Sequence, residues 1–363
     1  MSDDPKSSLG SVSEPYFEPI GPGAGSAFEA GFGDDDGIRR RAPVFQKAAL
    51  AGAAVWLAGL ATLRFWGMAV GTLCAAWAGV AGMVLLPGPA GESTQWLPAP
   101  VLTYLLASSV LPAAAALAAV HWGMSACRRP TGGGTGARVV TALVTAGLQG
   151  LVLALLILGT LLVQAGAAGQ PGSVAGVSAE VAAAEGFIFG SMGAAVGAIG
   201  RRTVLTRITG WALALFLVAG TAAAGAALVP VVRADEPVTV ALNIERAPDG
   251  TVIAYQCSAV SAGLREVYHT DRIMWLPAIS PSVVFVMLAG APGDGAGLLG
   301  WLSAALQEAA DGTRVPCVNG EPRSTDAPGA PLAVVGLVLQ TGVAGVLLGW
   351  AHAVTGRRPD KAR

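Results

Sequence analysis

Long apolar stretches without acidic residues are the feature that most constrains how this chain folds. No Asp or Glu occurs between Glu92 and Glu180, or between Glu185 and Asp235. Only 12 % of the 363 residues are charged, about half the share found in soluble domains, and the mean hydropathy is +0.60. A membrane-spanning helix needs about 20 apolar residues and satisfies its own backbone hydrogen bonds. The sequence therefore predicts an all-α, multi-pass protein whose surface contacts membrane lipid.

Six stretches are long and apolar enough to cross the membrane. They are 65–86, 101–122, 139–164, 183–200, 208–230 and 332–354. The fourth is short, and its Glu185 is expected at the outer edge, because a charge in the bilayer centre is costly. No Asp, Glu or Lys is then expected in the interior of a span, which disfavours a stand-alone ion-coupled transporter. Gln149 and Gln340 are expected to form hydrogen bonds between helices.

Basic residues indicate the orientation of the spans. With six spans, the loops 87–100 and 165–182 lie outside, and neither contains Lys or Arg. The basic residues of the other short loops and of both ends then lie inside, as the positive-inside rule requires. They are Arg39, Arg40, Arg41, Lys47, Arg128, Arg129, Arg138, Arg201, Arg202, Arg207, Arg357, Arg358, Lys361 and Arg363. Both termini are therefore expected in the cytoplasm.

The run 44–86 fits either one or two crossings, because Arg64 interrupts it. An arginine at the bilayer centre costs about 2.5–3.5 kcal/mol on insertion scales, so Arg64 is expected at an interface. Two crossings would invert every later loop against the basic-residue pattern. We therefore expect residues 46–63 to form an interfacial entry helix, with residues 44–230 forming the first membrane region.

Polar segments flank these spans. Residues 1–43 are rich in Gly, Ser, Pro and acidic residues, which is typical of a disordered tail, and residues 355–363 form a second cytoplasmic tail. Charged residues return in 231–331, between the fifth span and the sixth at 332–354. This segment is expected to form a small α+β domain outside the membrane.

Within 231–331, two alternating runs flank the turn signal at 248–250 and predict a β-hairpin. The run SVVFVMLA at 282–289 is expected to be a further short strand, because it is too short to span the membrane. The run LLGWLSAALQEAADG predicts a helix that ends at Gly312, and RVPCV predicts a last strand.

The cysteines give a disulfide prediction. Cys74 falls in the first span and Cys127 in a cytoplasmic loop, whereas Cys257 and Cys317 are both expected outside. An oxidising compartment and a matched pair predict a bond between these two. In the chain-entropy model such a long loop closure is worth about 4 kcal/mol.

Glycines recur at four-residue spacing, which lets helix backbones approach closely. The pairs are Gly67 and Gly71, Gly186 and Gly190, Gly193 and Gly197, and Gly345 and Gly349. Packing within one bundle is the favoured interpretation. A seam between chains in a homo- or hetero-oligomer is the alternative.

Signals for an enzyme are poor. The run GGGTGAR at 132–138 lacks the Lys-Ser/Thr of a phosphate-binding loop. His121 and His352 are expected near the inner face and His269 outside, so the three cannot share a metal. The group at 269–271 favours a solvated turn over a catalytic site. We therefore predict no catalytic, cofactor or metal site and, with a net charge of -1, no nucleic-acid partner.

One run resembles a known family. The sequence HTDRIMWLPAISPSVVFVMLAGAP (269–292), which lies between Cys257 and Cys317, resembles permease subunits of actinobacterial ATP-binding-cassette exporters of the type-two class. The resemblance covers about 257–354 in sequence, and elsewhere it covers the layout of entry helix and six spans. The apolar entry helix and the short loop between spans two and three depart from that pattern.

The resemblance implies a non-catalytic permease subunit in a bacterial plasma membrane, working with a separate ATPase chain. It places the contact with the ATPase in the loop 123–138, where Arg128 and Arg129 offer charged hydrogen bonds. The alternative role of these arginines is to set the topology alone. The alternative function, from a different class, is an orphan envelope protein whose outer domain binds a ligand or partner.

Overall fold

The structure is a computed structural model, which describes residues 35–85, 97–128, 135–200, 203–246, 248, 252–290, 297–312, 317–318, 321–322 and 330–356. The chain divides into two compact units, 1–46 and 47–363. Residues 1–34 of the predicted tail 1–43 lie outside the described residues. Helix α1 (Asp35–Leu60) reaches into the rest of that predicted tail. The predicted C-terminal tail 355–363 lies outside them from residue 357 on.

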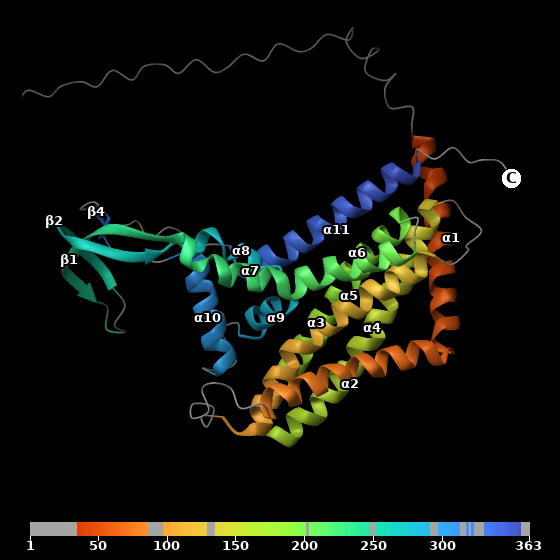
Figure 1. Cartoon of the computed structure of the whole chain (residues 1–363), viewed down its shortest axis with the longest axis horizontal. Helices are drawn as coiled ribbons and strands as arrows, with labels where there is room; N and C mark the ends of the chain where they lie inside the picture. Colours follow the sequence, from red (N-terminus) through yellow and green to blue (C-terminus); the bar gives the residue numbers. More distant parts are fainter. Residues whose placement is uncertain are drawn as a thin grey trace, which may run out of the picture. The chain divides into compact units, whose positions relative to one another are not determined.

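Six helices of the described part are long and apolar enough to cross a membrane, which confirms the predicted number (Figure 1). They are α2 (Leu63–Leu85), α3 (Ala99–Cys127), α4 (Thr135–Ala168), α5 (Ser173–Ile199), a fifth span made of α6 (Thr203–Leu215), η3 (Phe216–Gly220), α7 (Thr221–Leu228) and η4 (Val229–Val232), and α11 (Leu332–Gly356).

The fourth span is longer than predicted. α4 continues to Ala168 and α5 begins at Ser173, so the predicted loop 165–182 is wrong for most of its length. The start of α5 is rich in Ala, Ser and Gly, and its hydropathy is therefore low. It nevertheless lies inside the protein, where Ser178 Oγ donates to the Ser108 carbonyl oxygen at 2.8 Å. A helix enclosed by other helices does not need the hydropathy of one that faces lipid.

The consecutive helices α3, α4 and α5 alternate in direction. Ser108 of α3 contacts Ser178 of α5, and further along both helices Val120 contacts Gly193. The residue numbers increase in the same direction, so these two helices are parallel. α4 runs the opposite way beside α5, because a Cβ on Gly190 would contact Ala146 and one on Gly186 would contact Gly150. The end of α3 and the starts of α4 and α6 therefore lie at one end of the bundle.

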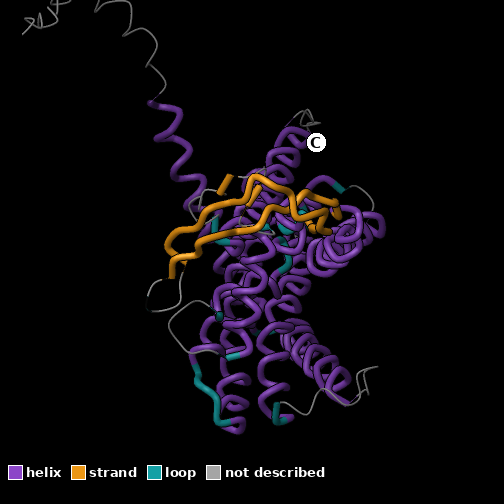
Figure 2. The backbone as a smooth tube through the Cα atoms, turned by 90° about the vertical axis from the view of Figure 1, so that its left-hand side faces the viewer, coloured by secondary structure: helices purple, strands orange, loops and turns teal. Residues whose placement is uncertain are grey.

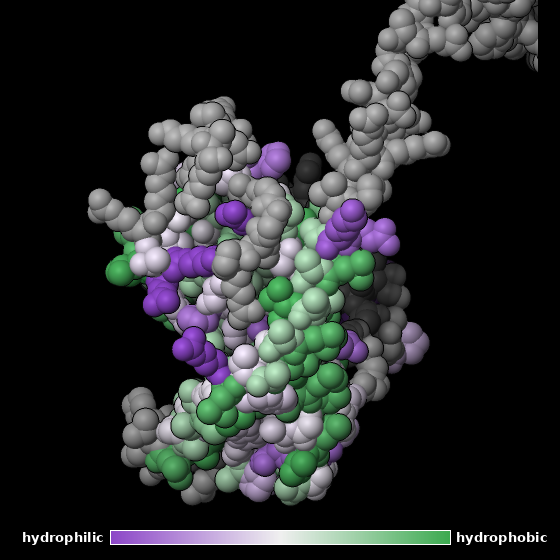
Figure 3. Space-filling view, turned by 90° about the vertical axis from the view of Figure 1, so that its right-hand side faces the viewer, coloured by the Kyte–Doolittle hydropathy of each residue, from purple (hydrophilic) through white to green (hydrophobic). Residues whose placement is uncertain are grey.

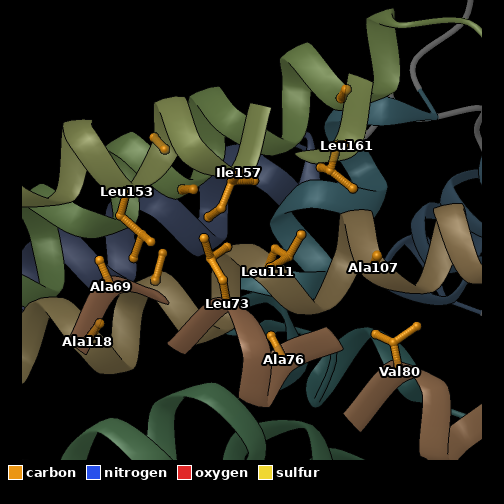
Figure 4. Close-up of a cluster of buried hydrophobic side chains, with 14 of the residues drawn as sticks. Ala69, Leu73, Ala76, Val80, Ala107, Leu111, Ala118, Leu153, Ile157 and Leu161 are labelled. Carbon is orange, nitrogen blue, oxygen red and sulfur yellow. The ribbon is translucent and has the colours of Figure 1, made fainter. Parts of the chain in front are cut away.

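Small and branched side chains fill the core between α2, α3 and α4 (Figure 4). One face of α2 contributes Ala69, Leu73, Ala76 and Val80, which meet Leu111 of α3 and Ile157 of α4 among others. Large apolar side chains elsewhere on the helices remain exposed, for example Leu155, Val163, Val338 and Val346. Hydrophobic residues cover much of the side shown in Figure 3, as expected for helices that face lipid.

Helix α1 ends at Leu60, and a short break separates it from α2. Thr62 Oγ1 donates to the Gly59 carbonyl oxygen at 2.7 Å, and Trp66 Nε1 donates to that of Leu60 at 2.8 Å. Arg64 then lies in the first turn of α2. The apolar part of α1, Phe45–Leu60, is shorter than the six spanning helices.

Residues 47–60 of α1 pack against the first half of α4. Thr141 and Thr145 donate to the carbonyl oxygens of Ala48 and Gly52, both at 3.2 Å. Gly52 makes this approach close, since a Cβ there would lie 2.8 Å from that of Val144. In Figure 1 the chain changes direction sharply between α1 and α2.

The predicted hairpin is present. β1 (Arg233–Arg246) and β2 (Val252–Tyr268) pair antiparallel from Arg233 opposite Tyr268 to Arg246 opposite Val252 (Figure 2). The short strands β3 (Cys317–Val318) and β4 (Glu321–Pro322) extend the sheet in the order β2-β1-β3-β4. β3 covers the end of the run RVPCV, and the rest of that run lies outside the described residues, as do residues 249 and 250 of the predicted turn.

The expected strand at 282–289 is wrong. The chain forms η5 (Thr270–Arg272), α8 (Trp275–Ala278) and α9 (Pro281–Ala289), and α9 packs against α3, α5 and α11. A short apolar run does not distinguish a buried strand from a buried helix, and Pro281 at the first helical turn favours the helix.

α10 (Leu298–Asp311) follows and ends at Gly312, as predicted. Gly312 has φ +79°, a conformation that glycine adopts without strain. α10 packs on α9, where Ser303 Oγ donates to the Gly290 carbonyl oxygen at 3.0 Å. The expected α+β domain 231–331 thus divides into a sheet and a group of helices that packs on the spanning helices.

Candidate functional site: a polar core between α5, α9 and α11

Glu185 lies near the middle of α5 and is fully buried, with 0 % of its surface exposed. It is the one buried charged residue in the part of the chain that the structure describes. The expectation that it lies at an outer edge is therefore wrong, and so is the inference that no acidic residue occupies the interior of a span. The error follows from placing the start of this helix at 183 instead of Ser173.

Gln340 of α11 is also buried and binds Glu185. Its Nε2 atom donates to Glu185 Oε1 at 3.0 Å and to the carbonyl oxygen of Ile279 at 2.7 Å. Ile279 lies in the connection between α8 and α9. The predicted interhelical role of Gln340 is confirmed, and one amide group joins three segments that are far apart in sequence.

Ser280 continues this connection toward the fifth span. Its hydroxyl donates to the carbonyl oxygen of Val218 at 2.8 Å. Ser280 is extended, with ψ 130°, because the residue before a proline disfavours the helical conformation. Val218 lies in η3, a π-helical turn in the middle of the span, and such turns occur often at functional sites.

We call these groups the polar core: the side chains of Glu185, Gln340 and Ser280, and the carbonyl groups of Ile279 and Val218. Glu185 Oε2 and Gln340 Oε1 are buried, and neither has a hydrogen-bond partner among the described residues. Buried polar atoms are nearly always paired. Both unpaired atoms are oxygens, so the site lacks a hydrogen-bond donor or a cation.

Two glycines allow α8 to enter between neighbouring helices. A Cβ on Gly336 of α11 would lie 2.1 Å from the carbonyl oxygen of Ala278. A Cβ on Gly225 of α7 would lie 2.9 Å from Cδ of Pro277. The close approach of α7 and α11 to α8 brings Ile279 to the level of Gln340 and Ser280 to the level of Val218.

The glycines singled out from sequence have two different environments. Those of α5 face other helices: a Cβ on Gly193 would lie 2.3 Å from the Val120 carbonyl oxygen, and one on Gly197 would lie 3.2 Å from Met124 Cα. Gly186 and Gly190 face α4. By contrast, a Cβ on Gly67, Gly71, Gly345 or Gly349 would meet nothing within 4 Å.

A second group of charged residues lies at the base of the hairpin. His269 Nε2 is 3.0 Å from Glu236 Oε1, and its Nδ1 is 4.0 Å from Asp271 Oδ1. Arg233 Nη2 pairs with Glu266 Oε2 at 2.5 Å, and the Tyr268 hydroxyl donates to the same carboxylate. That hydrogen bond and the charge of Glu266 raise the pKa of Tyr268. Within the described residues, no cluster of three or more His, Cys, Asp or Glu side chains could hold a metal ion.

The predicted disulfide joins Cys257 of β2 to Cys317 of β3. It fastens the short strand β3 to the sheet, although β3 and β2 are separated by β1 in the strand order. Cys74 and Cys127 are free thiols. Cys74 lies in α2, as predicted, whereas Cys127 is the last residue of α3 and does not lie in a loop.

The proposed coupling residues are described in part. Arg128 caps the end of α3, and its Nη2 donates to the carbonyl oxygen of Thr203, at the start of α6, at 3.2 Å. Arg129 lies outside the described residues. The bond to Thr203 gives Arg128 a structural role within the chain in addition to any contact with a partner.

Sequence reasoning found Gln340 but missed Glu185, Ser280 and the π-helical turn. The signal for Glu185 was available, since 173–199 is one continuous stretch without Pro, Lys or Arg. Ser280 lies between two prolines, Pro277 and Pro281, which mark a helix break. No protein-family model and no curated protein matches this sequence.

Proposed function

We propose that the chain is a non-catalytic, permease-like subunit of an ATP-binding-cassette exporter, working with a separate ATPase chain. The observation that carries this proposal is the polar core at a helix interruption. Transporters place substrate and ion sites beside discontinuous helices near the bilayer midplane, and buried ionisable residues mark such pathways. Here the break between α8 and α9 is linked to a buried carboxyl group through Gln340 and to the π-helical turn of the fifth span through Ser280.

The ATPase partner in this proposal comes from the sequence resemblance. Residues 269–290 of the run that carries it form η5, α8 and α9, so this run supplies Ile279 and Ser280 to the polar core. In the proposed orientation, both termini are cytoplasmic, and the hairpin lies outside a bacterial plasma membrane. Arg128, Arg138 and Arg207 lie at the same end of the bundle, and a shared basic end supports this orientation.

Purification of the tagged full-length chain from its native membrane in mild detergent tests the proposal. A nucleotide-binding ATPase chain should co-purify. Replacing Arg128 and Arg129 by Gln, with Arg138 kept, should leave insertion intact and weaken this association, since losing a buried charged contact costs about 2–5 kcal/mol. Arg207→Gln is the control, because it removes a basic residue at the same end on α6. The absence of any ATPase among the partners of the wild type would refute the proposal.

The hairpin supports a second candidate, an envelope protein that binds a ligand or partner outside the membrane. Val240, Leu242 and Ile244 alternate along β1, and each is nearly half exposed. Val260 and Leu264 of β2 are each 75 % exposed. An apolar row of this kind is a common feature of binding surfaces. Replacing the three β1 residues by Ser should abolish partner recovery under this candidate and should leave an ATPase association unchanged under the first.

A further inference from the structure

The two unpaired oxygens of the polar core identify what the site lacks. Gln340 uses both amide hydrogens, one on Glu185 and one on Ile279. Glu185 Oε2 and Gln340 Oε1 remain as acceptors without a donor. An ionised carboxylate in this position would be buried without a cationic partner, which is very unfavourable in a low-dielectric interior.

The ionisable groups on the helices around α5 do not supply that missing charge. α3 carries His121. Its neighbour Val120 contacts Gly193, which lies roughly two helical turns beyond Glu185 on α5, so His121 is not at the level of Glu185. Arg138 of α4 and Arg207 of α6 lie near the starts of their helices, at the basic end. His352 of α11 is exposed near the end of its helix, and α9 has no ionisable side chain.

We propose that Glu185 is a reversible proton-binding site that holds α11 and the α8–α9 connection against α5. The carboxylate takes a proton from water, and its O–H group becomes the donor that the two oxygens lack. A carboxylic acid and an amide are complementary, because each offers a donor and an acceptor. When the proton returns to water, the charged group no longer matches its surroundings, and the contact with Gln340 loosens.

A proton fits the site better than a metal ion. Calcium and magnesium take six or more oxygen ligands, whereas two side-chain oxygens are unpaired at this place in the described structure. The link to movement is also specific. Gln340 binds Ile279 with the same nitrogen that binds Glu185. Ser280, the residue after Ile279, directly precedes α9 and binds the π-helical turn.

Infrared difference spectroscopy of the full-length protein in lipid nanodiscs tests proton binding. At neutral pH, the spectrum of the wild type minus that of Glu185→Gln should show the carbonyl band of a protonated carboxylic acid. Glu180→Gln is the matched control, because Glu180 is exposed on the same helix, and its difference spectrum should lack that band. A wild-type spectrum in which Glu185 contributes only carboxylate bands at neutral pH would overturn the proposal, and a sodium-dependent change of those bands would assign the site to a cation instead.

Hydrogen exchange of residues 275–290 tests the coupling to movement. After correction for intrinsic rates, exchange in the wild type should become about five- to tenfold faster on raising the pH, the factor for losing one net hydrogen bond. Glu185→Gln, which stays neutral, should abolish this pH dependence. Glu185→Ala should exchange fast at every pH. Equal pH dependence in the wild type and in Glu185→Gln would overturn the coupling. Neither measurement requires an ATPase, so the outcome is separate from that of the partner purification.

Discussion

The contact between α3 and α5 and the β1–β2 hairpin are stabilised in different ways. α3 and α5 meet through glycines, and a Cβ on Gly123 would lie 2.1 Å from the Gly190 carbonyl oxygen. In the hairpin, by contrast, apolar side chains of β1 remain nearly half exposed, the two strands are joined by backbone pairing, and a disulfide ties β2 to the short strand β3. Lipid provides no hydrophobic drive between helices, so the bundle depends on close packing. A perturbation that weakens one region should therefore leave the other intact.

The largest effect is expected from the disulfide. Replacing Cys257 and Cys317 by Ser opens a loop with a sequence separation of 60, and in the chain-entropy model this costs about 4 kcal/mol. Hydrogen exchange should rise in β1, β2 and the β3 segment and should stay unchanged in α3 and α5. Equal loss of protection in the helices would show that the two regions unfold together and would break the comparison.

A smaller effect is expected from α5. Gly193→Ala forces a methyl group against the backbone of Val120, and overpacking of this kind costs about 1–3 kcal/mol. Thermal unfolding of the bundle in detergent should occur at a lower temperature, while exchange in the hairpin stays as in the wild type.

Gly345→Ala is the matched control for that substitution. It changes the same residue type in a spanning helix, but a Cβ there meets nothing within 4 Å. Its unfolding temperature should equal or exceed that of the wild type, because alanine favours a helix. If this variant instead disrupts an oligomer, the open face of α11 is a seam between chains, as the alternative interpretation of the glycines held.

The same contrast explains which parts of the structure the sequence predicted. Hydropathy identified the six helices, because each helix is long and rich in apolar residues. The hairpin follows from a local turn signal, and the disulfide follows from the two cysteines that are both expected outside. α5 was harder, because an enclosed helix can be built from Ala, Ser and Gly and can hold Glu185 in its interior. α9 was also missed, because its β-branched residues favour a strand until α3, α5 and α11 surround them.

The smallest effect concerns Tyr268, at the base of the hairpin. The hydrogen bond to Glu266, together with the charge of that carboxylate, raises the pKa of Tyr268 in the folded state. A raised pKa means that the folded state favours the protonated phenol. The stabilisation is therefore fully present below the usual tyrosine pKa of about 10 and is lost as the pH rises through the higher folded-state value. Because Tyr268 is exposed, the effect on stability should be slight, and absorbance is the more sensitive measurement.

Glu266→Gln should shift the phenolate transition of Tyr268, identified by comparison with Tyr268→Phe, to lower pH. Asp271→Asn, which changes a neighbouring carboxylate that pairs with His269, should leave it unchanged. If Glu266→Gln does not move the transition, the Tyr268–Glu266 contact does not persist in solution, and the pairing of β1 with β2 is left to stabilise that end of the hairpin.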